Sequence, residues 1–69
     1  MTIKTMTEEE IINAINKVQG IGGMTVNERL FLSGLMDEFD RARIHDKEKA
    51  KKILELLGVD EFSIQQIVK

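Results

Sequence analysis

The sequence has no cysteine, proline, tryptophan or tyrosine, and it has one histidine. Without cysteine, neither a disulfide nor a thiolate metal site can reinforce the fold, and the absence fits a reducing compartment. Residues 1–10 contain no apolar run of signal-peptide length, and no stretch approaches the length of a membrane span. We therefore expect a cytoplasmic protein that has no membrane partner.

A chain of 69 residues predicts one helical domain that covers residues 1–69. A domain of this size buries only about 60% of the surface that its unfolded chain exposes, so its stability is modest. The apolar fraction of 42% is typical of a globular chain and argues against disorder. The core must come from aliphatic side chains, or a second copy must extend it.

Apolar residues recur at helical spacing throughout the chain, and no strand-like alternation occurs. This pattern predicts an all-α domain, a single small bundle of three main helices plus a short C-terminal helix. The relative lengths do not decide between an orthogonal and an up-down bundle. The expected helices cover about residues 8–18, 26–43, 47–57 and 64–68.

Capping residues set these boundaries. Capping boxes are predicted where a hydroxyl residue precedes Glu or Gln by three positions, and Asp46 is the expected N-cap of the third helix. Gly58 should end that helix. The three capping boxes are Thr7 with Glu10, Thr25 with Glu28, and Ser63 with Gln66.

Each expected helix has an apolar stripe that we assign to the core. The chain has three phenylalanines and no other aromatic residue, so we assign all three to the core, which argues against base stacking. The main stripe, on the helix 26–43, is Phe31, Leu32, Leu35, Met36, Phe39 and Ala42. The other core residues are Ile11, Ala14, Ile15, Val18, Ala50, Ile53, Leu54, Leu57, Val59, Phe62, Ile64, Ile67 and Val68.

Residues 27–40 follow the pattern N-E-R-L-F-x-x-G-L-x-x-x-F-D. This segment resembles a group of small, uncharacterised bacterial proteins in which a charged turn is followed by a short helix containing Ile-Leu, as Ile53-Leu54 does here. The resemblance covers roughly residues 25–60. It implies that the helices 26–43 and 47–57 form one unit to which the first helix is an addition. It implies no activity.

A second stripe on the helix 26–43 lies off the main apolar face and contains small residues, so another helix can approach it closely. The stripe either packs against the first helix or binds a partner. We favour a small helical interaction or regulatory protein that acts by protein–protein contact, with another protein or with itself as a homodimer. The candidate interface is Val26, Arg29, Leu30, Ser33 and Gly34.

The alternative is a nucleic-acid-binding module. The turn Gly20-Ile21-Gly22-Gly23 resembles the hairpin of a helix-hairpin-helix motif, whose backbone amides and following helix N-terminus hold a phosphate. Against it, the hairpin has no lysine or arginine, and the first helix opens with three glutamates. The candidate contacts of this alternative are Gly20, Gly22, Gly23, Arg41, Arg43, Lys47 and Lys51.

Charge is unevenly distributed, because residues 41–52 carry six basic and two acidic side chains within a chain of net charge -2. Many of these cations have an acidic residue three or four positions away. We therefore interpret the segment as a solvated helix surface in preference to a polyanion-binding site. The expected pairs are Asp37 with Arg41, Asp40 with Arg43, Glu48 with Lys52, and Lys51 with Glu55.

His45, with Asp46 beside it and Asp37 and Asp40 upstream, is the one candidate for a metal or acid–base cluster. One histidine supplies one strong ligand, whereas zinc sites usually need three or four protein ligands. Asp37, Glu38 and Asp40 are expected on the outer side of their helix. We therefore expect a surface histidine, no enzyme, no metal, no cofactor and no small-molecule substrate.

Overall fold

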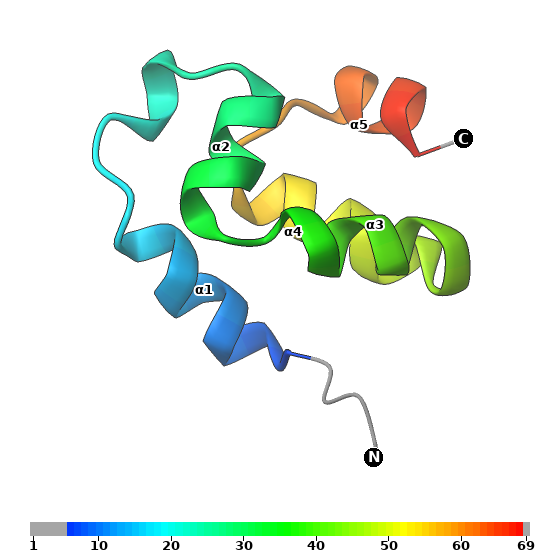
Figure 1. The fold of residues 1–69 in the computed structure, drawn as a ribbon. Helices are drawn as coiled ribbons and strands as arrows, with labels where there is room; N and C mark the ends of the chain where they lie inside the picture. The colour runs from blue at the N-terminus through cyan, green and yellow to red at the C-terminus, as the bar shows by residue number, and fades with distance from the viewer. Residues whose placement is uncertain (1–5, 69) are drawn as a thin grey trace.

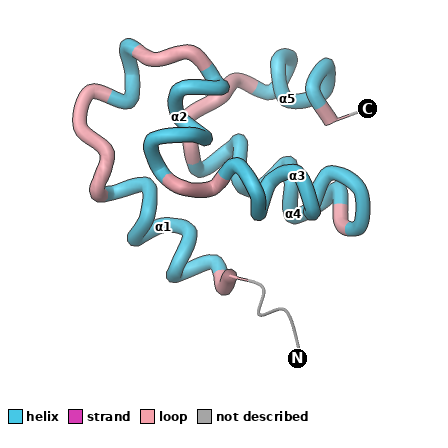
Figure 2. The backbone as a smooth tube through the Cα atoms, viewed as in Figure 1, coloured by secondary structure: helices cyan, strands magenta, loops and turns pink. Residues whose placement is uncertain are grey.

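A computed structural model describes residues 6–68, and within that range the chain is helical with short connections (Figures 1 and 2). The all-α class predicted from the sequence is confirmed, but the arrangement is not three main helices plus one short helix. The molecule measures about 38 × 27 × 16 Å. The elements are α1 (Glu8–Asn16), the 3₁₀ turn η1 (Ile21–Gly23), α2 (Val26–Ser33), α3 (Met36–His45), α4 (Lys47–Leu56) and α5 (Glu61–Ile67).

The first two predicted capping boxes are present. In α1, Thr7 Oγ1 accepts a hydrogen bond from the Glu10 amide at 3.2 Å, and the Glu10 carboxylate accepts one from the Thr7 amide at 2.9 Å. Thr25 and Glu28 make the same reciprocal pair, also at 3.2 and 2.9 Å. These bonds satisfy amides that have no partner within the helix, so both helices begin where the sequence indicates.

The predicted single helix over 26–43 is wrong, because Gly34 divides it into α2 and α3. Gly34 adopts φ +77°, a left-handed conformation that glycine reaches at little cost. Its amide donates to the Phe31 carbonyl at 3.1 Å, and the Leu35 amide donates to the Leu30 carbonyl at 3.0 Å. This pair of bonds is a Schellman motif, which ends a helix and turns the chain.

The break separates the two halves of the predicted apolar stripe. On α3, Phe39 and Ala42 are buried, as is Leu35 at the helix start. On α2, Phe31 is 73% exposed and Leu32 is 54% exposed, so their assignment to the core is wrong. Leu30, which the sequence places off the main face, is instead buried at 2% exposure.

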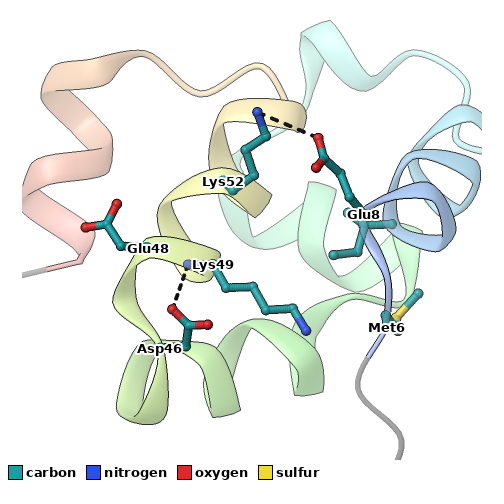
Figure 3. A pocket seen from close by; sticks show the side chains of 7 residues that line it. Met6, Glu8, Asp46, Glu48, Lys49 and Lys52 are labelled. Carbon is teal, nitrogen blue, oxygen red and sulfur yellow. Dashed lines mark hydrogen bonds and ion pairs between the residues drawn. The ribbon is translucent and has the colours of Figure 1, made fainter.

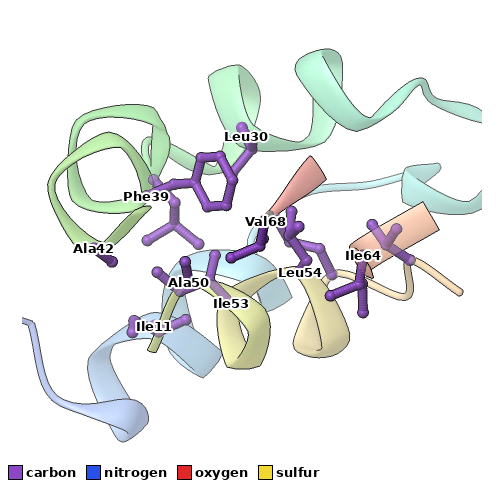
Figure 4. Close-up of a cluster of buried hydrophobic side chains, with 12 residues drawn as sticks. Ile11, Leu30, Phe39, Ala42, Ala50, Ile53, Leu54, Ile64 and Val68 are labelled. Carbon is purple, nitrogen blue, oxygen red and sulfur yellow. The ribbon is translucent and has the colours of Figure 1, made fainter. Parts of the chain in front are cut away.

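The core lies between α3 and α4, which lie side by side and receive side chains from the other helices (Figures 1 and 4). Gly58, at φ +84°, ends α4 with the same Schellman bonds that close α2, as predicted for this position. Ile11 attaches α1 to α4. The buried apolar residues are Ile11, Leu30, Leu35, Phe39, Ala42, Ala50, Ile53, Leu54, Leu57, Val59, Ile64 and Val68.

The last helix begins earlier than the sequence predicts. Asp60 is its N-cap, accepting hydrogen bonds from the Ser63 amide at 3.0 Å and the Ser63 hydroxyl at 2.7 Å. The predicted capping box of Ser63 with Gln66 is therefore wrong. Phe62 falls on the outer side of α5 and is 73% exposed, which overturns its assignment to the core. Within residues 6–68, every helix is too short or too polar to span a bilayer.

Candidate functional site

The residues of the predicted interface make contacts within the chain. Leu30 belongs to the core, and Val26 is half-buried against it. The Ser33 hydroxyl donates to the Leu30 carbonyl at 3.2 Å, and Gly34 makes the turn into α3. In this conformation the stripe packs within the chain, and its apolar members are not offered to a partner.

Arg29, also in that predicted interface, holds the loop before α2 against the end of α4. Its Nε donates to the Met24 carbonyl at 3.1 Å, and its Nη2 to the Gly22 carbonyl at 3.4 Å. Its Nη1 donates to the Leu57 carbonyl at 3.1 Å. A guanidinium fits this position because its fork of donors reaches several carbonyls, and its charge favours the negative end of a helix dipole.

Two exposed large apolar side chains lie instead on the opposite side of α2. Phe31 and Leu32 project from it one turn after Asn27 and Glu28, and Met36 follows at the start of α3. Together these five residues line a shallow hollow of about 520 Å³. We call this the α2 apolar surface: Asn27, Glu28, Phe31, Leu32 and Met36.

Other exposed apolar residues stand apart from this surface. Ile12, Ile44 and Phe62 lie on α1, α3 and α5 respectively and do not line the hollow. Single exposed apolar residues are common on soluble proteins, whereas a contiguous apolar patch more often marks a contact site. The α2 apolar surface is therefore the candidate functional site.

Sequence reasoning missed this site because it treated residues 26–43 as one helix. The signal that indicates the break is the pair Ser33-Gly34, since glycine is the preferred residue just after a helix end. With α2 ended there, its only possible core stripe is Val26 and Leu30, four residues apart. Phe31 and Leu32 then fall on the other side of the helix.

The nucleic-acid alternative needs the hairpin and the basic segment to form one surface. Gly20 has φ +72°, but the Gly23 and Met24 amides already donate to carbonyls within the loop, at 3.1 and 3.2 Å. The Glu28 carboxylate occupies the N-terminus of α2, where a phosphate would bind. The loop and the α3–α4 turn also lie at opposite ends of the molecule in Figure 1.

The basic residues are partly neutralised, by partners other than those predicted. Arg41 pairs with Glu38 at 2.7 Å instead of Asp37. Lys52 contacts Glu8 of α1 at 3.7 Å instead of Glu48, as Figure 3 shows. Lys51 approaches Glu48 at 3.8 Å instead of Glu55. The predicted pair of Asp40 with Arg43 does not form within residues 6–68, where Arg43 and Lys47 make no ion pair.

Glu38 is buried, which corrects its predicted place on the outer side of the helix. Its carboxylate accepts from Lys49 Nζ of α4 at 2.5 Å as well as from Arg41, so it ties α3 to α4. Burial raises the pKa of Glu38, but hydrogen bonds and positive charge from Lys49 and Arg41 outweigh it and hold that pKa below its ordinary value of 4.5. Glu38 is therefore charged at neutral pH.

A second hollow, of about 430 Å³, lies between the starts of α1 and α4 (Figure 3). Its charged groups are already engaged with one another or with the fold. Lys49 reaches Glu38, Lys52 contacts Glu8, and the Asp46 carboxylate accepts the Lys49 amide at 3.2 Å as the α4 N-cap. The hollow therefore offers a ligand few groups that are not already paired.

His45 is exposed at the end of α3. Its neighbour Asp46 caps α4, and within the part of the chain that the structure describes no three His, Cys, Asp or Glu side chains are grouped to hold a metal ion. Comparison with protein-family models, with curated proteins and with solved structures finds no match. The function is therefore inferred from the surface of the protein itself.

Proposed function

We propose that this protein is a small cytoplasmic helical interaction protein, which acts by binding a protein through the α2 apolar surface. The observation that carries the proposal is the exposure of two adjacent large apolar side chains, Phe31 at 73% and Leu32 at 54%, beside Met36. The proposal keeps the kind of function expected from the sequence and moves the contact to the other side of α2.

The energetics support a binding role for these side chains. Burying a large apolar side chain gives about 1.5–3 kcal/mol, so Phe31 and Leu32 can anchor a partner. Phenylalanine and methionine are also enriched at protein interfaces. Moving a water-exposed apolar patch into an interface is favourable in itself, whereas its exposure in the free protein adds nothing to the stability of the fold.

Protein is favoured over nucleic acid because of the charge near the exposed aromatic residues. Phe31 lies one turn from Glu28, whose pKa is lowered by hydrogen bonds from the Thr25 backbone and side chain. Phe62 follows Asp60 and Glu61, and the pKa of Asp60 is lowered by hydrogen bonds from Ser63. Carboxylates that stay ionised beside an aromatic ring repel a phosphate backbone, so base stacking there is disfavoured.

The test compares two phenylalanines of equal exposure. Phe31 and Phe62 are both 73% exposed, so replacing either one removes the same amount of apolar surface from water. The variants Phe31→Ser and Phe62→Ser are first checked for native helix content by circular dichroism. Each is then immobilised beside the wild type and exposed to an extract of the source organism, and sedimentation equilibrium measures self-association.

We expect the wild type and Phe62→Ser to retain the same protein, or to show the same dimer, and Phe31→Ser to lose it. Loss with Phe62→Ser alone would place the contact on α5 and contradict the proposal. The proposal would also be contradicted if the wild type and both variants were monomeric and retained the same proteins from the extract.

A further inference from the structure

We propose that the occupant of the α2 apolar surface is a basic amphipathic helix of another protein. This inference rests on the proposed function and adds the chemistry of the partner. An amphipathic helix is a recurring ligand of apolar grooves, because its apolar residues at i, i+3, i+4 and i+7 form a narrow stripe that anchors it. Charged side chains around the hollow then favour a partner helix with opposite charges beside its apolar stripe.

The rim of the α2 apolar surface is acidic. Glu28 lies within it, Asp37 follows Met36 directly, and Asp40 lies one turn after Met36 on the same side of α3. All three are exposed, and none takes part in an ion pair within residues 6–68. These three carboxylates therefore place negative charge at the rim, and none of it is paired with a cation of the described residues.

The cations closest in sequence do not balance this charge. Arg29, the only cation of α2, is turned away from the rim and bound to the carbonyls of Gly22, Met24 and Leu57. Arg41 is bound to Glu38 on the side of α3 that faces α4. Arg43 lies one turn beyond Asp40, at the end of the row that is farther from Phe31. Lysine and arginine of a partner helix would supply the missing charge.

The same rim disfavours the other occupants. A second copy packed by two-fold symmetry would bring two copies of the same acidic rim together, and like charges in an interface oppose association. An anionic membrane surface and a nucleic acid would be repelled for the same reason. A basic amphipathic helix complements both the apolar floor of the hollow, which is Phe31, Leu32 and Met36, and its acidic rim.

The experiment uses two synthetic helical peptides as probes. Both carry leucine at i, i+3, i+4 and i+7; one has lysine and arginine at the flanking positions, and the other has glutamate. Each is titrated into the full-length isotope-labelled protein and followed by amide chemical shifts at low and moderate salt. We expect the basic peptide to bind at least about ten-fold more tightly, to shift amides of Phe31, Leu32 and Met36, and to lose part of its preference when salt is added.

Two sets of variants separate the floor from the rim. Phe31→Ser should abolish binding of the basic peptide. Asp37→Asn with Asp40→Asn should reduce its preference over the acidic peptide several-fold, whereas Glu9→Gln with Glu55→Gln should leave that preference unchanged. The control pair removes the same total charge from exposed acids of α1 and α4.

The outcomes distinguish this inference from the function on which it rests. Equal affinities with shifts confined to the α2 apolar surface would overturn charge selection and leave the apolar contact in place. Tighter binding of the acidic peptide would overturn the inference outright. Failure of both peptides to bind would also overturn it, and a concentration-dependent dimer lost in Phe31→Ser would then assign the surface to a second copy. If neither peptide binds and no protein contact or dimer depends on Phe31, the proposed function is overturned as well.

Discussion

α2 and α3 follow each other in the chain and carry parts of one apolar stripe in the sequence, but they use it differently. α3 buries Phe39 and Ala42 against α4, whereas α2 leaves Phe31 and Leu32 in water and buries Leu30. The difference arises at Gly34, where two hydrogen bonds end α2 and reset the direction of the chain. A turn of one residue therefore decides which side chains form the core and which remain for a partner.

The two glutamates of these helices follow the same division. Glu38 on α3 is 3% exposed and is held by Lys49 and Arg41, whereas Glu28 on α2 is exposed and bound only to Thr25 at the helix start. One glutamate stabilises the packing of two helices, and the other begins a helix and leaves its charge at the surface. α3 is thus a structural helix, and α2 presents a surface.

The largest effect is expected at Leu30, the buried residue of α2. Leu30→Ala should lower the free energy of unfolding by about 2–5 kcal/mol, because it leaves a cavity where a fully buried side chain was. Chemical denaturation followed by circular dichroism measures this. Because a small domain has little stability to lose, Leu30→Asp should unfold it and cannot report on an interface. A folded Leu30→Asp variant with altered association would reinstate Leu30 as a contact residue.

The next largest effect is expected at Glu38, the buried carboxylate of α3. Glu38→Gln should lower the free energy of unfolding by about 1–3 kcal/mol, because Lys49 loses its partner across the α3–α4 contact. The matched control is Glu28→Gln, since glutamine also completes a capping box and should leave stability closer to the wild type. Equal losses in the two variants, measured by chemical denaturation, would show that Glu38 is no more structural than Glu28.

Acid should act through the same group. The pKa of Glu38 is lowered in the folded protein, so its contribution to stability is present above the unfolded value of 4.5 and is lost as pH falls through the folded pKa. Stability of the wild type, measured by denaturation at a series of pH values, should therefore fall below about pH 4.5. Glu38→Gln should flatten part of that fall. If Glu38→Gln had the same pH profile as the wild type, other carboxylates would cause the loss of stability at low pH.

The turn itself can be tested by adding one methyl group. Gly34→Ala should lower the free energy of unfolding by about 1–2 kcal/mol, because an L-residue is strained at φ +77°. The added Cβ would meet no atom within 4 Å, so the loss is conformational and not steric. Gly22→Ala is the control, with equally open space and no positive φ. A neutral Gly34→Ala would mean that the break between α2 and α3 does not depend on glycine.

Local signals predicted the parts of the fold that local bonds determine. The capping boxes at Thr7 and Thr25, the N-cap Asp46 and the C-terminal glycine Gly58 are all where the sequence places them. Each depends on residues within a few positions of one another, which a sequence displays directly. The stripe of α4 was predicted for the same reason, because its helix has one buried face and clear ends.

The rest depended on choices between competing signals. Asp60 and Ser63 are both good N-caps, and Asp60 became the cap because its carboxylate accepts from both the amide and the hydroxyl of Ser63. Gly34 was treated as a small residue on a helix surface, although it also fits a helix end. Glu38 was placed outside because its partner Lys49 is eleven residues away, beyond the range of helical pairing rules. The candidate site depends on the second of these choices, because Phe31 and Leu32 leave the core only when the helix ends at Gly34.

The smallest effect on stability is expected where we expect the largest effect on binding. Phe31→Ser should change the free energy of unfolding by no more than about 0.5 kcal/mol, because the side chain is already mostly in water in the folded protein. Its chemical denaturation should match that of Phe62→Ser, while only Phe31→Ser loses the protein contact. A loss of several kcal/mol from Phe31→Ser would instead mean that Phe31 packs within the fold in solution. α2 would then be a structural helix like α3, and the contrast between the two helices would not hold.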